Sequence, residues 1–522
     1  MLCYSIVSCH KDRIEEFQSV NLNPQSLETE EGSEGLMEFA PATPNPYTLA
    51  NMQLALNELY AHNQMDCDTS IFNIRVTHEY IKFIPADSAA YIKLIQDSTL
   101  ILFDYPLDRK LTKAGTYYRD SSLSEGQPNY QWACVIKNKE LPDVPYEILA
   151  ELYLPEEDPE LTQYDGTEYD ACITLLIDEA LKLTGNYDTL DHLENMTSGG
   201  ELFLSLPNKW TPSGTIRMED NTFSPATSVN LRGVKVHARR WFEIREAITD
   251  INGNFNVGHQ FRYPVNYTIK WERGDFEIRH KRVGQAYFNG PEQKSSWNLN
   301  ISSGYSRLYA IIHRAAHRYY YEAIEDLARP PRKNEQWGRM TIGAYDWDDV
   351  NLNGQCIMAR KVLSLPEIKI FKRNHDCEEI FSTTLHELAH ASHWNLVSHT
   401  DYYYFQGSPS SYVVHETFAV GISYALTRLE YPLHKGKLYD NPDYSNIIMD
   451  LIDNPTMEGT STNKKNKGWN NWQGDSVTDY TIKQIQDALV GEKTLYGWRD
   501  NLKDDTNNAT ENNVNAVFDH WW

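Results

Sequence analysis

The sequence has little of what several classes of protein require. Its seven cysteines are odd in number and scattered, and no Cys-x-x-Cys pair occurs. We therefore expect neither a thiolate zinc cluster nor a disulfide framework. No run of 18 apolar residues is present, so we expect no helix that crosses a membrane. Basic residues are also too few to balance the acidic ones, and the formal net charge is -25. Because an acidic surface repels phosphates, this charge excludes nucleic acid as a partner.

What the sequence does contain is typical of a folded protein of several domains. The chain has 522 residues, of which 41% are hydrophobic, with 13 Trp and 33 Tyr. The charge is uneven, because residues 1–200 hold 34 acidic and 12 basic residues, whereas residues 205–302 hold 9 acidic and 14 basic ones. Such shifts predict domain boundaries near residues 200 and 302. We expect a multidomain α+β protein.

The N-terminal segment MLCYSIVSCHKD is a short apolar run that ends at Cys9 and gives way to polar residues. It resembles the end of a bacterial lipoprotein signal peptide, in which the cysteine is lipidated. The usual basic start is missing. The resemblance implies a remnant signal at 1–9, a lipid anchor on Cys9 as the only membrane attachment, and a place in the cell envelope. Residues 10–45 contain Glu-rich and Pro-rich stretches, which predict a linker. The alternative is a slightly apolar terminus of a cytosolic protein.

Residues 46–204 are predicted to form a mixed α/β domain. Helices are indicated by three segments with helical periodicity, the last of which ends at Gly185. Strands are indicated by three segments rich in β-branched and aromatic residues. The predicted helices are NPYTLANMQLALNELYA (45–61), SAAYIKLIQ (88–96) and YDACITLLIDEALKLTG (169–185), and the predicted strands are IRVTHEYIKFIPA (74–86), TLILFDYPLD (99–108) and YQWACVIKN (130–138).

Residues 205–302 read as a run of short strands with turn signals between them. Asn252-Gly253 is a strong hairpin turn. The surrounding segment ITDINGNF resembles the transthyretin-like, carboxypeptidase-regulatory-type β-sandwich, which implies that fold for 205–302. Asp250, Asn252 and Asn254 also mimic the start of a calcium loop, but its sixth-position Gly and closing Glu are absent, so we interpret the segment as a turn.

Residues 303–522 are predicted to be mainly helical. The segment YSRLYAIIHRAAHRYYYEAIEDLA predicts one long helix that ends before Arg329-Pro330-Pro331. His313 and His317 share one face of it, and since no glutamate follows the first, we interpret them as a packed or solvated pair. Two segments, GRMTIGAYDW (338–347) and QCIMARKVL (355–363), are predicted strands.

A possible metal site begins in LHELAHASH. Asp376 and Glu379 form a capping-box start for a helix through this segment. Residues four apart on a helix leave the same face, so His386 and His390 can bind one ion. Glu387 lies beside the first ligand, where it can act as a general base instead of a ligand.

The third ligand is predicted in SPSSYVVHETFAVGISYAL. Glu416 lies in an otherwise apolar helical segment, where a buried carboxylate is costly unless it binds a cation. HExxH followed by a glutamate on the next helix resembles the gluzincin branch of zinc metallopeptidases. That resemblance implies Zn²⁺ on His386, His390 and Glu416, a zincin-like domain at 303–522, and Glu387 as the general base.

Other residues near the motif have weaker roles. His393 is too far along the helix axis from His386 to share its ion. We expect His393, His415 and Tyr404 either to orient a metal ligand or to donate to an oxyanion, with structural packing as the alternative for each. The glycine of the metzincin pattern is absent, and no acidic residue four after Glu416 is present to orient the imidazoles.

The motifs together predict a zinc-dependent hydrolase, most simply a peptidase with peptide or protein substrates. The layout resembles bacterial surface lipoproteins that carry a gluzincin-like domain behind a transthyretin-like domain. The alternative is a non-catalytic surface protein that binds peptide or glycan on a zincin scaffold, which would not need Glu387. A third possibility is a zinc amidase that acts on cell-wall peptides.

Overall fold

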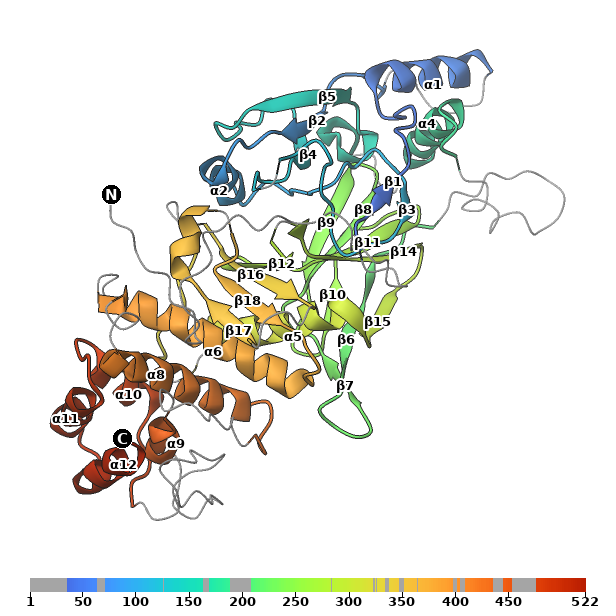
Figure 1. The fold of residues 1–522 in the computed structure, drawn as a ribbon. Helices are drawn as coiled ribbons and strands as arrows, with labels where there is room; N and C mark the ends of the chain where they lie inside the picture. The colour runs from blue at the N-terminus through green and yellow to red at the C-terminus, as the bar shows by residue number, and fades with distance from the viewer. Residues whose placement is uncertain are drawn as a thin grey trace, which may run out of the picture.

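The computed structural model is a mixed α+β structure, as predicted (Figure 1). The predicted signal at 1–9 with Cys9, the first part of the predicted linker, and Tyr404 lie outside the residues that it describes. The structure describes residues 35–62, 71–124, 126–162, 169–187, 208–282, 284–322, 324, 326–333, 338–346, 352–363, 365–397, 401–403, 409–434, 445–452 and 476–522.

The N-terminal part is built around a three-stranded antiparallel sheet flanked by helices. All three predicted helices form, and the first begins at Thr48, whose hydroxyl caps the backbone N–H of Asn51. The predicted strand in 99–108 is wrong: Phe103 makes only an isolated bridge to Trp132. In spatial order the strands are β4 (Gln131–Ile136), β2 (His78–Phe83) and β5 (Tyr146–Leu152), and the helices are α1 (Leu49–Ala61), α2 (Ser88–Gln96) and α4 (Tyr169–Leu183).

The described end of the predicted linker is packed against this part of the chain. Strand β1 (Glu38–Phe39) pairs with β3 (Leu111–Lys113), and Met37 is buried in the N-terminal core. Cys172 on α4 is disulfide-bonded, whereas Cys134, Cys356 and Cys377 are free. The sequence predicted no disulfide framework and did not indicate this bond, because spacing along the chain does not show which thiols the fold brings together.

Two four-stranded sheets follow, and side chains from both contribute to one core. Asn252-Gly253 forms a turn, but the predicted hairpin is wrong, because the strands before and after it pair in different sheets. Asp250 Oδ1 accepts hydrogen bonds from the backbone N–H groups of Asn252 and Asn254, and Gly253 has a φ of 77°. One sheet contains β7 (Thr227–Asn230), β6 (Ser213–Asp220), β10 (Asn254–Asn256) and β15 (Trp297–Ile301); the other contains β14 (Tyr287–Gln293), β11 (Val265–Lys270), β8 (Lys235–Arg240) and β9 (Glu243–Ile248).

A five-stranded sheet joins the strand-rich part to the C-terminal part, across the boundary predicted near residue 302. Its three central strands are parallel, and one antiparallel strand lies at each edge. The pairing crosses the predicted boundary because two of its strands precede residue 302. In spatial order the strands are β13 (Gly284–Gln285), β12 (Phe276–His280), β16 (Met340–Tyr345), β18 (Ile368–Phe371) and β17 (Gly354–Cys356).

The helix and strands predicted between residues 303 and 363 are confirmed in part. Helix α5 (Gly304–Tyr321) ends earlier than expected, and the guanidinium of Arg329 donates to the carbonyls of Tyr320 and Glu322 at its C-terminus. The strand predicted in 338–347 forms. Of the strand predicted in 355–363 only its first two residues pair, and a 3-10 helix begins at Met358.

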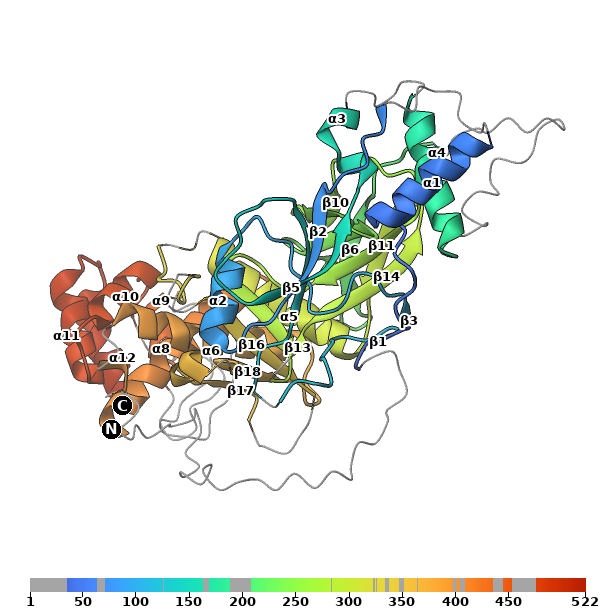
Figure 2. The same ribbon diagram turned by 90° about the horizontal axis from the view of Figure 1, so that it is seen from above.

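Helix α6 (Cys377–Leu396) contacts β17 and β18 of this sheet, helix α5 and helix α8 (Pro409–Arg428). Figure 2 shows α8 and the remaining C-terminal helices gathered at one end of the molecule, with α1 and α4 at the other. No helix among the described residues is long and apolar enough to span a bilayer. The remaining C-terminal helices are α9 (Ile447–Ile452), α10 (Ile482–Leu489), α11 (Leu495–Asp505) and α12 (Val514–Trp521).

Candidate metal centre

Helix α6 positions the two histidines. It begins as predicted at Asp376, whose carboxylate accepts a hydrogen bond of 2.9 Å from the backbone N–H of Glu379. One turn separates His386 from His390, and their Nε2 atoms lie 3.1 Å apart. The helix therefore directs two imidazole nitrogens at one point, as the spacing predicted.

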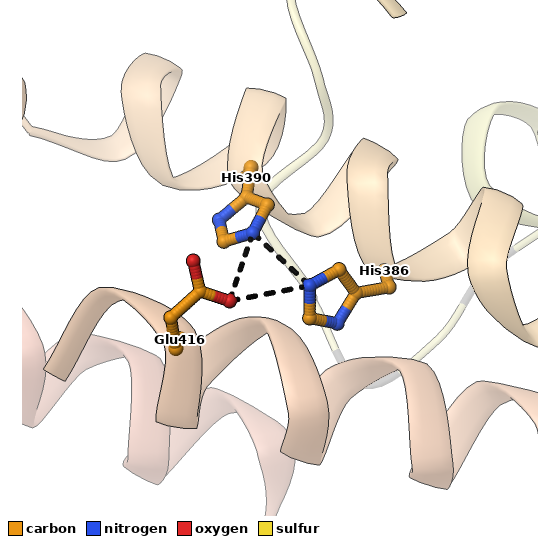
Figure 3. Close-up of side chains that lie close together, drawn as sticks. All are labelled: His386, His390 and Glu416. Atoms are coloured by element: carbon orange, nitrogen blue, oxygen red, sulfur yellow. Dashed lines mark hydrogen bonds and ion pairs between the residues drawn. The ribbon is translucent and has the colours of Figure 1, made fainter. Parts of the chain in front are cut away.

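Helix α8 supplies the third group. Glu416 Oε2 lies 3.4 Å from His386 Nε2 and 3.4 Å from His390 Nε2 (Figure 3). Ligands arranged tetrahedrally at about 2.0–2.1 Å from a zinc ion are separated by about 3.3–3.4 Å. The triangle of side-chain atoms thus has the size that a small tetrahedral cation requires, and the buried group can hold a metal ion.

Burial makes this group costly without a cation. The side chains of His390 and Glu416 are 0% exposed and that of His386 is 10% exposed. Neither oxygen of Glu416 accepts a hydrogen bond from the part of the chain that the structure describes. A carboxylate shielded from water in this way is unfavourable unless a positive charge lies beside it, so the residues present fit a bound cation.

The electrostatics of the triad agree with that conclusion. Burial alone would lower the pKa of His390, but the carboxylate of Glu416 outweighs it and the pKa is raised. Burial alone would raise the pKa of Glu416, but His390 and His386 hold it well below the usual range of a glutamate. The carboxylate is therefore ionised and available as a ligand.

Glu387 lies on α6 beside the first histidine, against strand β17. It is buried, and the carboxylate raises the pKa of His390, though less than Glu416 does. A methyl group built on Gly354 would lie 2.5 Å from Glu387 Oε1 and 2.8 Å from Thr383 Cγ2. Only a glycine permits this approach. The sequence does not reveal this requirement, because an isolated Gly in a short strand indicates a close contact but not the residue that makes it.

The other predicted residues line the site without joining the triad. The ring of His415 stacks on His390 with centroids 4.0 Å apart, and His415 Nδ1 lies 3.2 Å from His393 Nδ1. Burial, then the neighbouring His390, lowers the pKa of His393 to about 3 and that of His415 well below its usual range, so both rings are neutral. Tyr402 meets His415 edge to face at 5.0 Å. An oxyanion role for either histidine stays a prediction.

His313 and His317 lie elsewhere. Both are buried on α5, where His313 Nε2 lies 3.1 Å from the carbonyl oxygen of Arg232. His317 Nδ1 lies 3.7 Å from Glu322 Oε1. The interpretation of a packed pair holds for both.

The fold and the site define an α+β protein with a buried His-His-Glu group that can hold a metal ion. Comparison with known protein families finds no family that matches the chain, and comparison with curated proteins finds no match either.

The ring of His415 stacks on His390 and holds the orientation of this imidazole. The sequence has no acidic residue four after Glu416 that could do so. We expect His415→Ala to weaken metal binding by about 10–100-fold, because ligands lose affinity when the groups that orient them are removed. Competition with a chromophoric chelator measures the change. His415→Phe keeps a flat ring and should retain more of the affinity, and His313→Ala, a buried histidine remote from the triad, should leave it unchanged. Equal affinity in His415→Ala and the wild type would contradict the orienting role.

Proposed function

We propose that the chain is a zinc-dependent hydrolase that cleaves peptide bonds, with zinc on His386, His390 and Glu416. The observation that carries the proposal is the buried triangle of two imidazole nitrogens and one carboxylate oxygen with Glu387 next to it in the chain. Bound zinc supplies a Lewis acid that polarises a carbonyl and acidifies water. Glu387 is the general base: it accepts a proton from the attacking water and passes it to the leaving amine.

Strand β17 supports a peptide as the substrate. It lies at the edge of the five-stranded sheet, and among the described strands it pairs only with β18. An extended polypeptide can add to such an edge through backbone hydrogen bonds. Because Gly354 brings this strand against Glu387, a peptide added there would pass close to the general base.

One observation favours the alternative of a non-catalytic binding protein. The three ligands are almost completely buried, as in metal sites that only stabilise a fold. A structural ion would explain the buried Glu416 equally well, but it would leave Glu387 without a role.

The disulfide of Cys172 supports the proposed location in the cell envelope. Disulfides persist mainly in oxidising compartments outside the cytosol. We therefore propose an envelope protein, attached through a lipid on Cys9.

The proposal is tested by elemental analysis of the purified full chain together with cleavage of a peptide library, before and after a chelator. We expect about one zinc per chain and cleavage that stops on chelation and returns with added zinc. Stoichiometric metal without cleavage of any library member would favour the binding protein. Cleavage that persists after complete metal removal would rule out the metal mechanism.

A further inference from the structure

Strand β5 has an open edge that still carries large apolar side chains. Among the described strands it pairs only with β2. Its second edge is bridged at its C-terminal end, where Leu152 pairs with Thr48 and the N–H of Tyr153 donates to the carbonyl of Tyr47, which leaves residues 146–150 of that edge open (Figure 1). Tyr146 and Ile148 are each 46% exposed, and Leu149 is 38% exposed. An unpaired strand edge with exposed apolar side chains is a template for a further strand.

The apolar side chains on one face of the sheet continue from β2 onto β5, where no further strand covers them. Tyr146 lies opposite Phe83 and Ile148 lies opposite Ile81 on β2. Phe83 and Ile81 are fully buried, whereas their partners on β5 are half exposed. A strand added beyond β5 would cover Tyr146 and Ile148 in the way that β5 covers the residues of β2.

The charges of β5 determine which polypeptide segment can pair with its open edge. Its two charged residues are Glu147 and Glu151, and no cation lies on the strand. Within the described part of the chain Glu147 forms no ion pair, and Glu151 is 3.4 Å from a lysine, Lys137, that also binds Glu79. The net charge of -22 over residues 1–200 has the same sign. A second copy of the chain would face these glutamates with its own, and like charges across a strand pair are destabilising.

We propose that β5 is a docking strand for an extended, basic polypeptide segment of a partner, which adds to the sheet as a fourth strand. Backbone hydrogen bonds would hold the segment, its apolar side chains would cover Tyr146 and Ile148, and its lysines or arginines would pair with Glu147 and Glu151. The bulge at Leu149 between the two paired stretches limits the contact to a few residues. This surface is separate from the metal centre and does not depend on the proposed activity.

The test uses a labelled octapeptide of alternating lysine and valine, and fluorescence anisotropy with the full chain carrying Glu387→Gln, so that the probe is not hydrolysed. We expect saturable binding that weakens as the salt concentration rises. The double substitution Glu147→Lys/Glu151→Lys should weaken it by at least about tenfold and should favour an octapeptide of alternating glutamate and valine. Asp504→Lys/Asp505→Lys makes the same change in net charge on an exposed part of α11 and should leave the preference unchanged.

Three results would overturn the proposal. The first is no saturable binding of the basic octapeptide. The second is equal binding by the wild-type and the charge-reversed strand, which would place the peptide elsewhere, for example at β17. The third is concentration-dependent dimerisation of the protein that the Glu147→Lys/Glu151→Lys change abolishes, which would make a second copy the occupant. A proline at the centre of the octapeptide should abolish binding, because proline cannot donate a backbone hydrogen bond to β5.

Discussion

Replacement of Glu416 by alanine is expected to abolish metal binding at the centre and, with it, hydrolysis. The substitution leaves two imidazoles with their Nε2 atoms 3.1 Å apart and removes the carboxylate from the triad. Structural zinc sites bind with about 10–16 kcal/mol spread over their ligands, so the loss of one is expected to cost at least about 10³-fold in affinity. Zinc per chain after dialysis against a weak chelator is the measurement.

The metal-free protein provides a second readout for Glu416→Ala. Metal binding to the native state raises the Tm of the wild type, and the variant should show no such rise. Without metal the variant should be less stable than the wild type at neutral pH, because His390 and His386 hold the pKa of Glu416 well below its usual range and the folded state loses that attraction. Glu379→Ala, near the start of α6, is the matched control and should keep both the metal and the rise in Tm. Full zinc occupancy in Glu416→Ala would move the third ligand to another residue.

Glu387→Gln is expected to separate metal binding from turnover. The amide has nearly the same size as the carboxylate, so it fits beside Gly354, but it cannot accept a proton from water. We expect an unchanged zinc content and a fall in kcat of about 10²–10⁴-fold, the usual contribution of a general base. Initial rates on the best substrate of the peptide library measure this fall.

The control for Glu387→Gln is the nearby Glu379→Gln, which should leave kcat unchanged. Undiminished turnover in Glu387→Gln would exclude this residue as the base. Loss of zinc in the same variant would instead make the carboxylate a ligand, and the assignment of the triad would need revision. The two variants therefore test different roles: Glu416→Ala tests metal binding, and Glu387→Gln tests proton transfer from water.

The ligand pair could be predicted from the sequence because its geometry is local. A helix places residues four apart on one face whatever surrounds it, so His386 and His390 follow from their spacing once the start at Asp376 is recognised. Glu416 was reachable by a second local argument, since a carboxylate within an apolar helical segment needs a cation. The structure brings all three together.

Long-range pairing could not be predicted in this way. The boundary expected near residue 302 is crossed by the pairing of β12 with β16, strands separated by about 60 residues of sequence. The segment 99–108 has the composition of a strand but makes a single bridge, and Cys172 is disulfide-bonded although no spacing pattern indicated it. Each outcome depends on which distant partner offers the better contact, and composition does not contain that information.

By itself the sequence determined the start of α6 at Asp376, the turn at Asn252-Gly253 and the ligand spacing on α6, because each follows from backbone geometry within a few residues. Only the tertiary structure decided that His415 stacks on His390, that Gly354 makes room for Glu387, and that β5 keeps an open acidic edge. These features arise where elements distant in the chain meet, and that meeting is set by the summed free energy of packing the whole chain and not by the conformational preference of any one segment.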